Sequence, residues 1–207
     1  MRHIEKKEPI PAFLDFLHRG SHSNWNDIHD EVNYPGLYRN CRDQILIDEQ
    51  DCMSGYTEMP LDREGNIHID HFKKKGMFMT ETFNWNNFIV DSLDSGYGAC
   101  YKDSRISNDS DYDKLINPVE EDPHDYFTYQ SNGNIVPKSG LSASKLEKAE
   151  FTRASFNLNH ESLRHKRLGI MRMTEQYKDI LTMQEIVSAL ALCGFKSVIE
   201  SVCNTAE

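Results

Sequence analysis

The chain has 207 residues, of which 38% are hydrophobic, and it carries a formal net charge of -10 at pH 7. This length suffices for one hydrophobic core. A mean hydropathy of -0.65 and the lack of any run of ~18 apolar residues exclude a membrane-spanning protein. Five cysteines at irregular spacing predict free thiols and no disulfide framework.

Residues 1 to about 50 predict a packed pair of helices. Pro9 and Pro11 precede an apolar cluster, and a polar stretch around Trp25 follows it. Clusters of this kind are usually recruited to the core of a small domain, and docking on a partner is the alternative. The first residues, Met-Arg-His-Ile-Glu-Lys-Lys, lack an apolar signal region, which predicts a cytoplasmic protein.

Residues 51–137 carry the most informative patterns. Apolar residues alternate with polar ones from Ile67 to Phe72, which predicts a half-buried strand. Asn84 is a good helix cap with aliphatic residues after it, so a short helix is expected from Trp85 to Leu93.

The end of this segment predicts a β-hairpin, because residues 126–129 and 135–136 resemble strands on either side of a Ser-Asn-Gly-Asn turn. Residues 138–207 are expected to be helical and to pack with the rest as one domain. Within them, Thr182 and Glu185 form a capping box before an apolar run that Gly194 should end.

The run His68-Ile69-Asp70-His71 and the later Asn87 combine the residue types that phosphodiester hydrolysis requires. His71 can activate water as a base, Asp70 can hold a divalent cation, and Asn87 can fix the orientation of the base. Asp70 and His71 would point to opposite faces of a regular strand. Both can reach one metal only if the strand ends or twists there.

Seven segments, in their order along the chain, resemble a known family. They are Ile47–Gln50, Ser54–Glu58, Ile69–Phe72, Trp85–Phe88, Leu115–Pro118, Gly133–Pro137 and Leu158–Leu163. This order is similar to that of PtuB-type HNH proteins, the nucleases of Septu and some retron antiphage systems. The resemblance implies an α+β fold in which a small ββα-metal (HNH) core is embedded in a mainly helical domain.

The resemblance also implies a function. It predicts a nuclease that hydrolyses phosphodiester bonds of DNA or RNA with Mg2+ or Mn2+ as cofactor. Its expected partners are a PtuA-type ATPase, the nucleic acid and, in retron systems, a reverse transcriptase with its RNA–DNA hybrid. No glycine-rich phosphate loop is present, so the ATPase activity has to come from another chain.

The chain departs from this family at its cysteines. Family members carry a Cys-x-Tyr-Cys-Glu run, where this chain has Ser-Gly-Tyr-Thr-Glu at residues 54–58. A later zinc cysteine is replaced by Ser92, and only Cys100 remains nearby. A closed zinc site needs four ligands, so we expect no structural zinc. Residues 101–103 offer no clean counterpart to the family's last metal ligand, which leaves the second ligand of the catalytic metal open.

The net charge argues against nucleic-acid binding, since polyanions usually meet basic surfaces. The charge is unevenly distributed, however: residues 138–172 contain eight Lys or Arg against three Glu, and residues 103–125 contain eight Asp or Glu against two basic residues. Arg164, Lys166 and Arg167, on one predicted helix, are the expected phosphate contacts. A solvated helix face is the alternative.

Two other classes of function fit the sequence. The chain can be a catalytically weak nucleic-acid-binding or regulatory subunit of the ATPase complex, which would account for the missing cysteines. It can also be a metal-dependent hydrolase of small phosphoesters or nucleotides, which suits its acidic charge.

Overall fold

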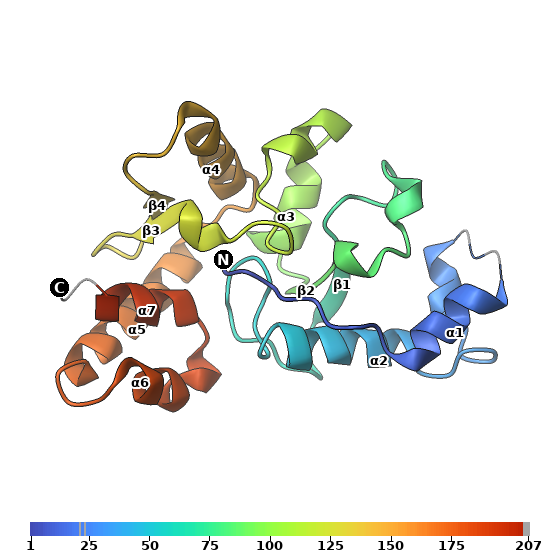
Figure 1. Ribbon diagram of the computed structural model, residues 1–207, viewed down its shortest axis with the longest axis horizontal. Coiled ribbons are helices and arrows are strands. Elements are labelled where there is room, and N and C mark those ends of the chain that lie inside the picture. Colours follow the sequence, from blue (N-terminus) through green and yellow to red (C-terminus); the bar gives the residue numbers. More distant parts are fainter. Residues whose placement is uncertain (21, 23, 205–207) are drawn as a thin grey trace.

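The computed structural model describes residues 1–20, 22 and 24–204 and has an α+β fold (Figure 1). In this part of the chain the helices are α1 (Pro11–Arg19), α2 (Leu37–Gln44), α3 (Gly98–Arg105), α4 (Ala143–Ser155), α5 (Glu161–Tyr177), α6 (Met183–Ala189) and α7 (Lys196–Asn204). The strands β1 (Ile67–His71) and β2 (Phe88–Ser92) form one sheet, and β3 (Phe127–Tyr129) and β4 (Ile135–Pro137) form another.

Short helical turns connect these elements. They are η1 (Trp25–His29), η2 (Ile45–Glu49), η3 (Met79–Glu81), η4 (Trp85–Asn87), η5 (Asp109–Lys114), η6 (Pro123–Asp125) and η7 (Ala191–Cys193). None of the helices in the described residues combines the length and the apolar composition that crossing a bilayer requires.

The expected helix from Trp85 to Leu93 is wrong beyond its first turn. The Asn84 side chain accepts a hydrogen bond from the Asn86 backbone N–H and begins η4, as a cap should. From Phe88 onward the chain instead forms β2, which runs antiparallel to β1. Aromatic and β-branched residues favour a strand, and here a neighbouring strand is available for pairing.

The other expected elements are present. α1 and α2 are the predicted N-terminal helices, and β3 and β4 form the predicted hairpin. Thr182 and Glu185 make the full capping box at the start of α6. Gly194, with a φ of 73°, lies between η7 and α7, where the apolar run ends.

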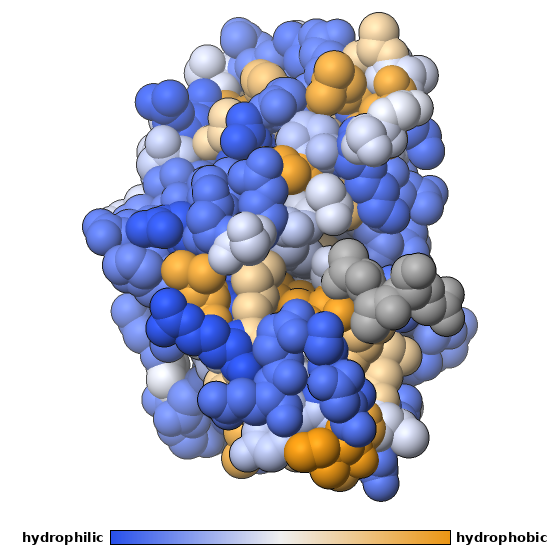
Figure 2. All heavy atoms as spheres, turned by 90° about the vertical axis from the view of Figure 1, so that its left-hand side faces the viewer, coloured by the Kyte–Doolittle hydropathy of each residue, from blue (hydrophilic) through white to orange (hydrophobic). Residues whose placement is uncertain are grey.

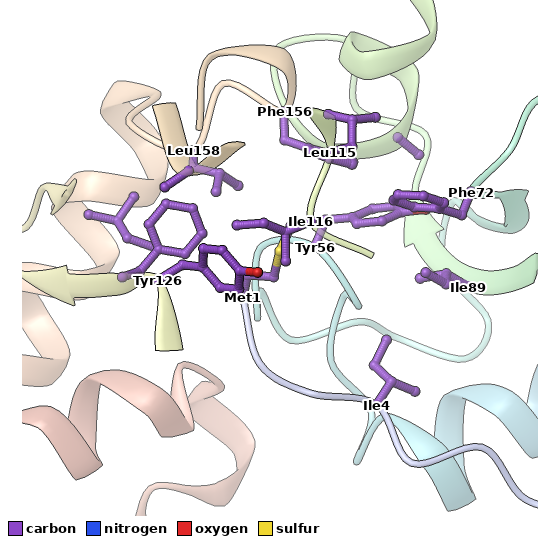
Figure 3. Close-up of a cluster of buried hydrophobic side chains, with 14 of the residues drawn as sticks. Met1, Ile4, Tyr56, Phe72, Ile89, Leu115, Ile116, Tyr126, Phe156 and Leu158 are labelled. Atoms are coloured by element: carbon purple, nitrogen blue, oxygen red, sulfur yellow. The ribbon is translucent and has the colours of Figure 1, made fainter. Parts of the chain in front are cut away.

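One hydrophobic cluster draws side chains from all three segments of the sequence (Figure 3). Ile4 comes from the N-terminal segment, Tyr56 and Phe72 from the middle, and Phe156 and Leu158 from the C-terminal segment. All five are at most 2% exposed. The three segments therefore share this hydrophobic cluster.

Two further clusters lie on either side of this one. The N-terminal helices, η1 and one face of the β1–β2 sheet enclose the second cluster, which contains Phe13, Trp25 and Phe88. The third cluster is formed mainly by α5, α6 and α7, which lie together at the end of the molecule opposite α1 (Figure 1). Figure 2 shows that this C-terminal end is largely hydrophilic, with apolar side chains gathered in a hollow across it.

Candidate functional site

His71 is the last residue of β1, and only 6% of it is exposed. Its Nε2 lies 2.9 Å from the backbone oxygen of Thr82. A carbonyl oxygen only accepts hydrogen bonds, so Nε2 carries the proton and Nδ1 is the basic nitrogen. Burial lowers the pKa of His71, although the Thr82 carbonyl and Asp70 oppose this effect. The imidazole is therefore neutral at pH 7 and has one nitrogen able to take a proton.

Aromatic side chains cover the His71 ring. The Trp25 ring meets it edge-on with centroids 4.4 Å apart, and the Phe88 ring lies 5.2 Å away. Trp25 belongs to η1, so a segment more than 40 residues upstream of His71 forms one wall of its environment. Lys75 places its ammonium 5.7 Å from the Trp25 ring and brings a positive charge next to this wall.

Asn87 positions His71 through the intervening loop. Its Oδ1 accepts a hydrogen bond from the Lys73 backbone N–H at 2.7 Å, and its Nδ2 donates to the backbone oxygens of Lys73 and Glu81. Glu81 directly precedes Thr82, whose carbonyl holds the His71 ring. Asn87 thus holds the loop whose Thr82 carbonyl contacts the imidazole, and its role in positioning a catalytic base stays a prediction from the sequence.

Asp70 points to the opposite face of β1 from His71. Its Oδ2 accepts a hydrogen bond from the Tyr56 hydroxyl at 2.5 Å and from the Lys102 ammonium at 2.8 Å. Asp70 is 5% exposed, and the Lys102 side chain is fully buried. β1 ends at His71, and each of the two side chains has its own set of partners.

Lys102 reaches Asp70 from α3. The helix begins at Gly98, which has a φ of 71°, and the Ala99 backbone N–H donates to the Asp91 carboxylate at 2.6 Å. A Cβ at position 98 would lie 2.3 Å from Asp91 Oδ2, so this close approach requires glycine. Burial alone would lower the pKa of Lys102, but the attraction of Asp70 and Asp103 outweighs it and raises the pKa. The lysine is therefore charged.

The arrangement around Asp70 does not fit a divalent cation as it stands. The ammonium of Lys102 occupies the position beside the carboxylate in which a metal ion would bind, and the Tyr56 hydroxyl occupies another position on the same oxygen. Within residues 1–20, 22 and 24–204, no three His, Cys, Asp or Glu side chains are grouped closely enough to hold a metal. A metal at Asp70 requires that Lys102 first withdraw.

Residues 54–58, where the PtuB-type family that this chain resembles has its first zinc cysteines, are held by hydrogen bonds. Ser54 Oγ accepts from the backbone N–H groups of Tyr56 and Thr57 at 3.2 and 3.0 Å. Asp91 is fully buried nearby, and burial raises its pKa to about 6 despite the hydrogen bonds from Ser54 and Ala99 that lower it. The absence of a structural zinc remains a prediction from the sequence.

The three basic residues expected to contact phosphate differ in accessibility. Lys166 is exposed on α5 and Arg164 is half-buried. Arg167 is 2% exposed, and its guanidinium donates to the backbone oxygens of Gly133 and Leu158. The expectation for Arg167 is wrong, because its charge serves to tie α5 to the β3–β4 turn. β1, which ends in His71, lies between α5 on one side of the molecule and α1 on the other (Figure 1).

Sequence reasoning missed the roles of Lys102 and Tyr56. A lysine within a polar helix usually faces solvent, and nothing in the local pattern Tyr-Lys-Asp indicates complete burial. One signal was available, since Lys102 lies in the stretch where the second metal ligand was sought. The sequence also did not single out Lys75, which lies closer to the His71 environment than the basic residues of α5.

Comparison with models of protein families gives no match for this chain, and comparison with curated proteins gives none either.

Proposed function

We propose that this chain is the HNH-type subunit of an antiphage complex and binds nucleic acid or regulates a PtuA-type ATPase there, without acting as a metal-dependent nuclease. The observation that carries this choice of role is the contact between Lys102 and Asp70. A buried ammonium 2.8 Å from the carboxylate already supplies the positive charge that a catalytic metal would bring. No chemical step at Asp70 is therefore assigned to a metal.

The order of the elements supports the family part of the proposal. β1 ends in His71, a loop held by Asn87 follows, β2 pairs back on β1, and α3 packs against β2. A ββα unit with the histidine at the end of its first strand is what the resemblance to HNH proteins implies. The seven ordered sequence segments provide the link to PtuB-type proteins and hence to the ATPase partner.

Two exposed basic side chains are available for a polyanion. Lys75 is exposed beside Trp25 and His71, and Lys166 is exposed on α5. Phosphate contacts of this kind position a nucleic acid and carry no sequence information. The overall charge of -10 opposes the binding of nucleic acid at long range, so contacts with nucleic acid depend on these two lysines and on the ATPase partner.

A metal-dependent nuclease acting on DNA or RNA is the second candidate, and the protonation of His71 favours it. A neutral imidazole whose Nε2–H is held by a carbonyl has Nδ1 free to take a proton from water. This role requires Lys102 to leave Asp70 and Mg2+ or Mn2+ to replace it, and Trp25 to expose the imidazole. Binding of the ATPase and nucleic acid would have to drive both changes.

Co-purification with a PtuA-type ATPase tests the two roles. The complex is offered DNA, tRNA and free nucleotides with ATP, and with either Mn2+ or a chelator. Under the proposal, the complex retains nucleic acid in chelator, and no cleavage depends on His71. The comparison variant is His71→Gln, which keeps an N–H donor for Thr82 but lacks a basic nitrogen.

Mn2+-dependent cleavage that His71→Gln abolishes would reject the binding or regulatory role and establish the nuclease. Hydrolysis confined to free nucleotides would identify a small-molecule hydrolase. If the complex forms but retains no nucleic acid, the role of the chain is to regulate the ATPase.

A further inference from the structure

The Lys102 ammonium lies in a cage of four oxygen atoms. Asp70 Oδ2 is 2.8 Å from Nζ, the backbone oxygens of His71 and Phe72 are each 3.1 Å away, and Asp103 Oδ1 is 3.2 Å away. We infer that this cage is a cation site whose resident cation is the protein's own lysine, and that shortening Lys102 converts it into a site for a divalent metal ion.

The ligand set of the cage suits a hard cation. Two carboxylates and two carbonyls supply four oxygen ligands with a formal charge of -2, which the Lys102 ammonium and the nearby Lys74 ammonium offset. Removing the Lys102 charge therefore leaves a net negative charge at the cage. Ca2+ and Mn2+ prefer such oxygens, and Ca2+ accepts irregular coordination at roughly 2.3–2.6 Å. The oxygens of the cage lie somewhat farther than this from Nζ, so the cage must contract slightly around a metal ion. Water can complete the coordination in the space that the lysine side chain leaves.

The elements that form the cage explain why it needs a cation. Asp70 and the two carbonyls come from the end of β1, whereas Lys102 and Asp103 come from α3. The end of a strand leaves carbonyl groups without ladder partners, and these carbonyls are buried together with a carboxylate. A single positive charge at the centre satisfies the carbonyls and joins the strand to the helix, which is the structural task that a metal ion performs in other proteins.

A second lysine provides a matched control. The Lys74 ammonium donates to the backbone oxygens of Asp103 and Ile106, and no carboxylate of the described residues forms an ion pair with it. Its removal leaves carbonyls alone, which do not compensate the charge of a divalent ion. A gain of metal binding should therefore follow Lys102→Ala and not Lys74→Ala.

This inference rests on the proposed function in that both require wild-type Asp70 to be without a metal. The test measures Mn2+ binding by electron paramagnetic resonance, together with the melting temperature in Ca2+ and in chelator. It uses the full chain as wild type, Lys102→Ala, Lys74→Ala and the double variant Asp70→Asn/Lys102→Ala. We expect about one Mn2+ per chain in Lys102→Ala, no bound Mn2+ in the other three, and a Ca2+-dependent rise in melting temperature for Lys102→Ala alone.

The outcomes separate the inference from the proposed function. If neither wild type nor Lys102→Ala binds Mn2+, the cage is not a cation site and the proposed role of the chain is unaffected. If wild type binds Mn2+ and the double variant Asp70→Asn/Lys102→Ala does not, both are wrong. If Lys102→Ala is unfolded in chelator, Ca2+ or Mn2+ must restore its fold, and failure of both ions to do so overturns the inference.

Discussion

Replacing Lys102 with methionine should be among the most destabilising single changes in this protein. Methionine keeps most of the side-chain length and removes the charge. Asp70 is 5% exposed and, among the described residues, would retain the Tyr56 hydroxyl as its one side-chain hydrogen-bond partner. Removing one member of a buried ion pair typically costs about 3–5 kcal/mol, because the other charge remains buried without compensation. The backbone oxygens of His71 and Phe72 lose a donor as well, so the upper part of this range is expected.

Urea unfolding at pH 7 measures this cost. The free energy of unfolding is compared for wild type, Lys102→Met, Asp70→Asn/Lys102→Met and Lys114→Met. The last variant removes an exposed pair with Asp111, in which 46% of the lysine side chain is exposed, and should cost less than about 1 kcal/mol. The double variant should recover part of the loss, because it no longer buries an uncompensated charge. A Lys102→Met cost no larger than that of Lys114→Met would refute the reasoning.

Three further predictions concern Asp91, Arg167 and His71. Burial raises the pKa of Asp91 from 3.8 to about 6, so the folded state binds a proton at this carboxyl more tightly than the unfolded state does. The resulting stabilisation of the folded state is fully present below pH 3.8 and is lost as the pH rises through 6. Asp91→Asn should remove this pH dependence, which amounts to up to about 3 kcal/mol in the free energy of unfolding measured by thermal unfolding. A pH dependence equal to that of wild type would contradict the raised pKa of Asp91. Arg167→Ala should cost roughly 2–4 kcal/mol in urea unfolding because two buried carbonyls lose a charged donor, whereas Lys166→Ala should stay within about 0.5 kcal/mol; equal costs would show that Arg167 is not structural. Diethyl pyrocarbonate, followed by mass spectrometry, should modify His71 more slowly than exposed His165, and equal rates would show that Trp25 does not shield His71.

The sequence predicted local structure well where the cause of that structure is local. The Thr182 capping box and the Asn84 cap depend on side chains within a few residues of the backbone groups they bind, and both are present. The stretch Phe88-Ile89-Val90 was assigned to a helix because its strand form depends on pairing with β1, about 20 residues upstream. A single-sequence pattern does not contain that partner.

The candidate site divides in the same way. The sequence identified Asp70, His71 and Asn87 by residue type, but the partner of Asp70 comes from α3, and the cover of His71 comes from η1. Lys102 follows Asp70 by 32 residues, and Trp25 precedes His71 by 46. Arg167 is the reverse case. A basic residue on a predicted helix is expected at the surface, but this one is buried and donates hydrogen bonds to the backbone oxygens of Gly133 and Leu158.

The alternation of β1 therefore has a functional consequence. Asp70 faces Tyr56 and α3 on one side of the strand, and His71 faces η1 and Phe88 on the other. A metal-dependent hydrolysis needs the cation and the base at one scissile phosphate, which requires both side chains to be accessible from the same side. Lys102 contacts Asp70 on one face, and Trp25 covers His71 on the other. These contacts come from different elements, α3 and η1, and hydrolysis requires the release of both. This is the physical argument behind the proposed binding or regulatory role.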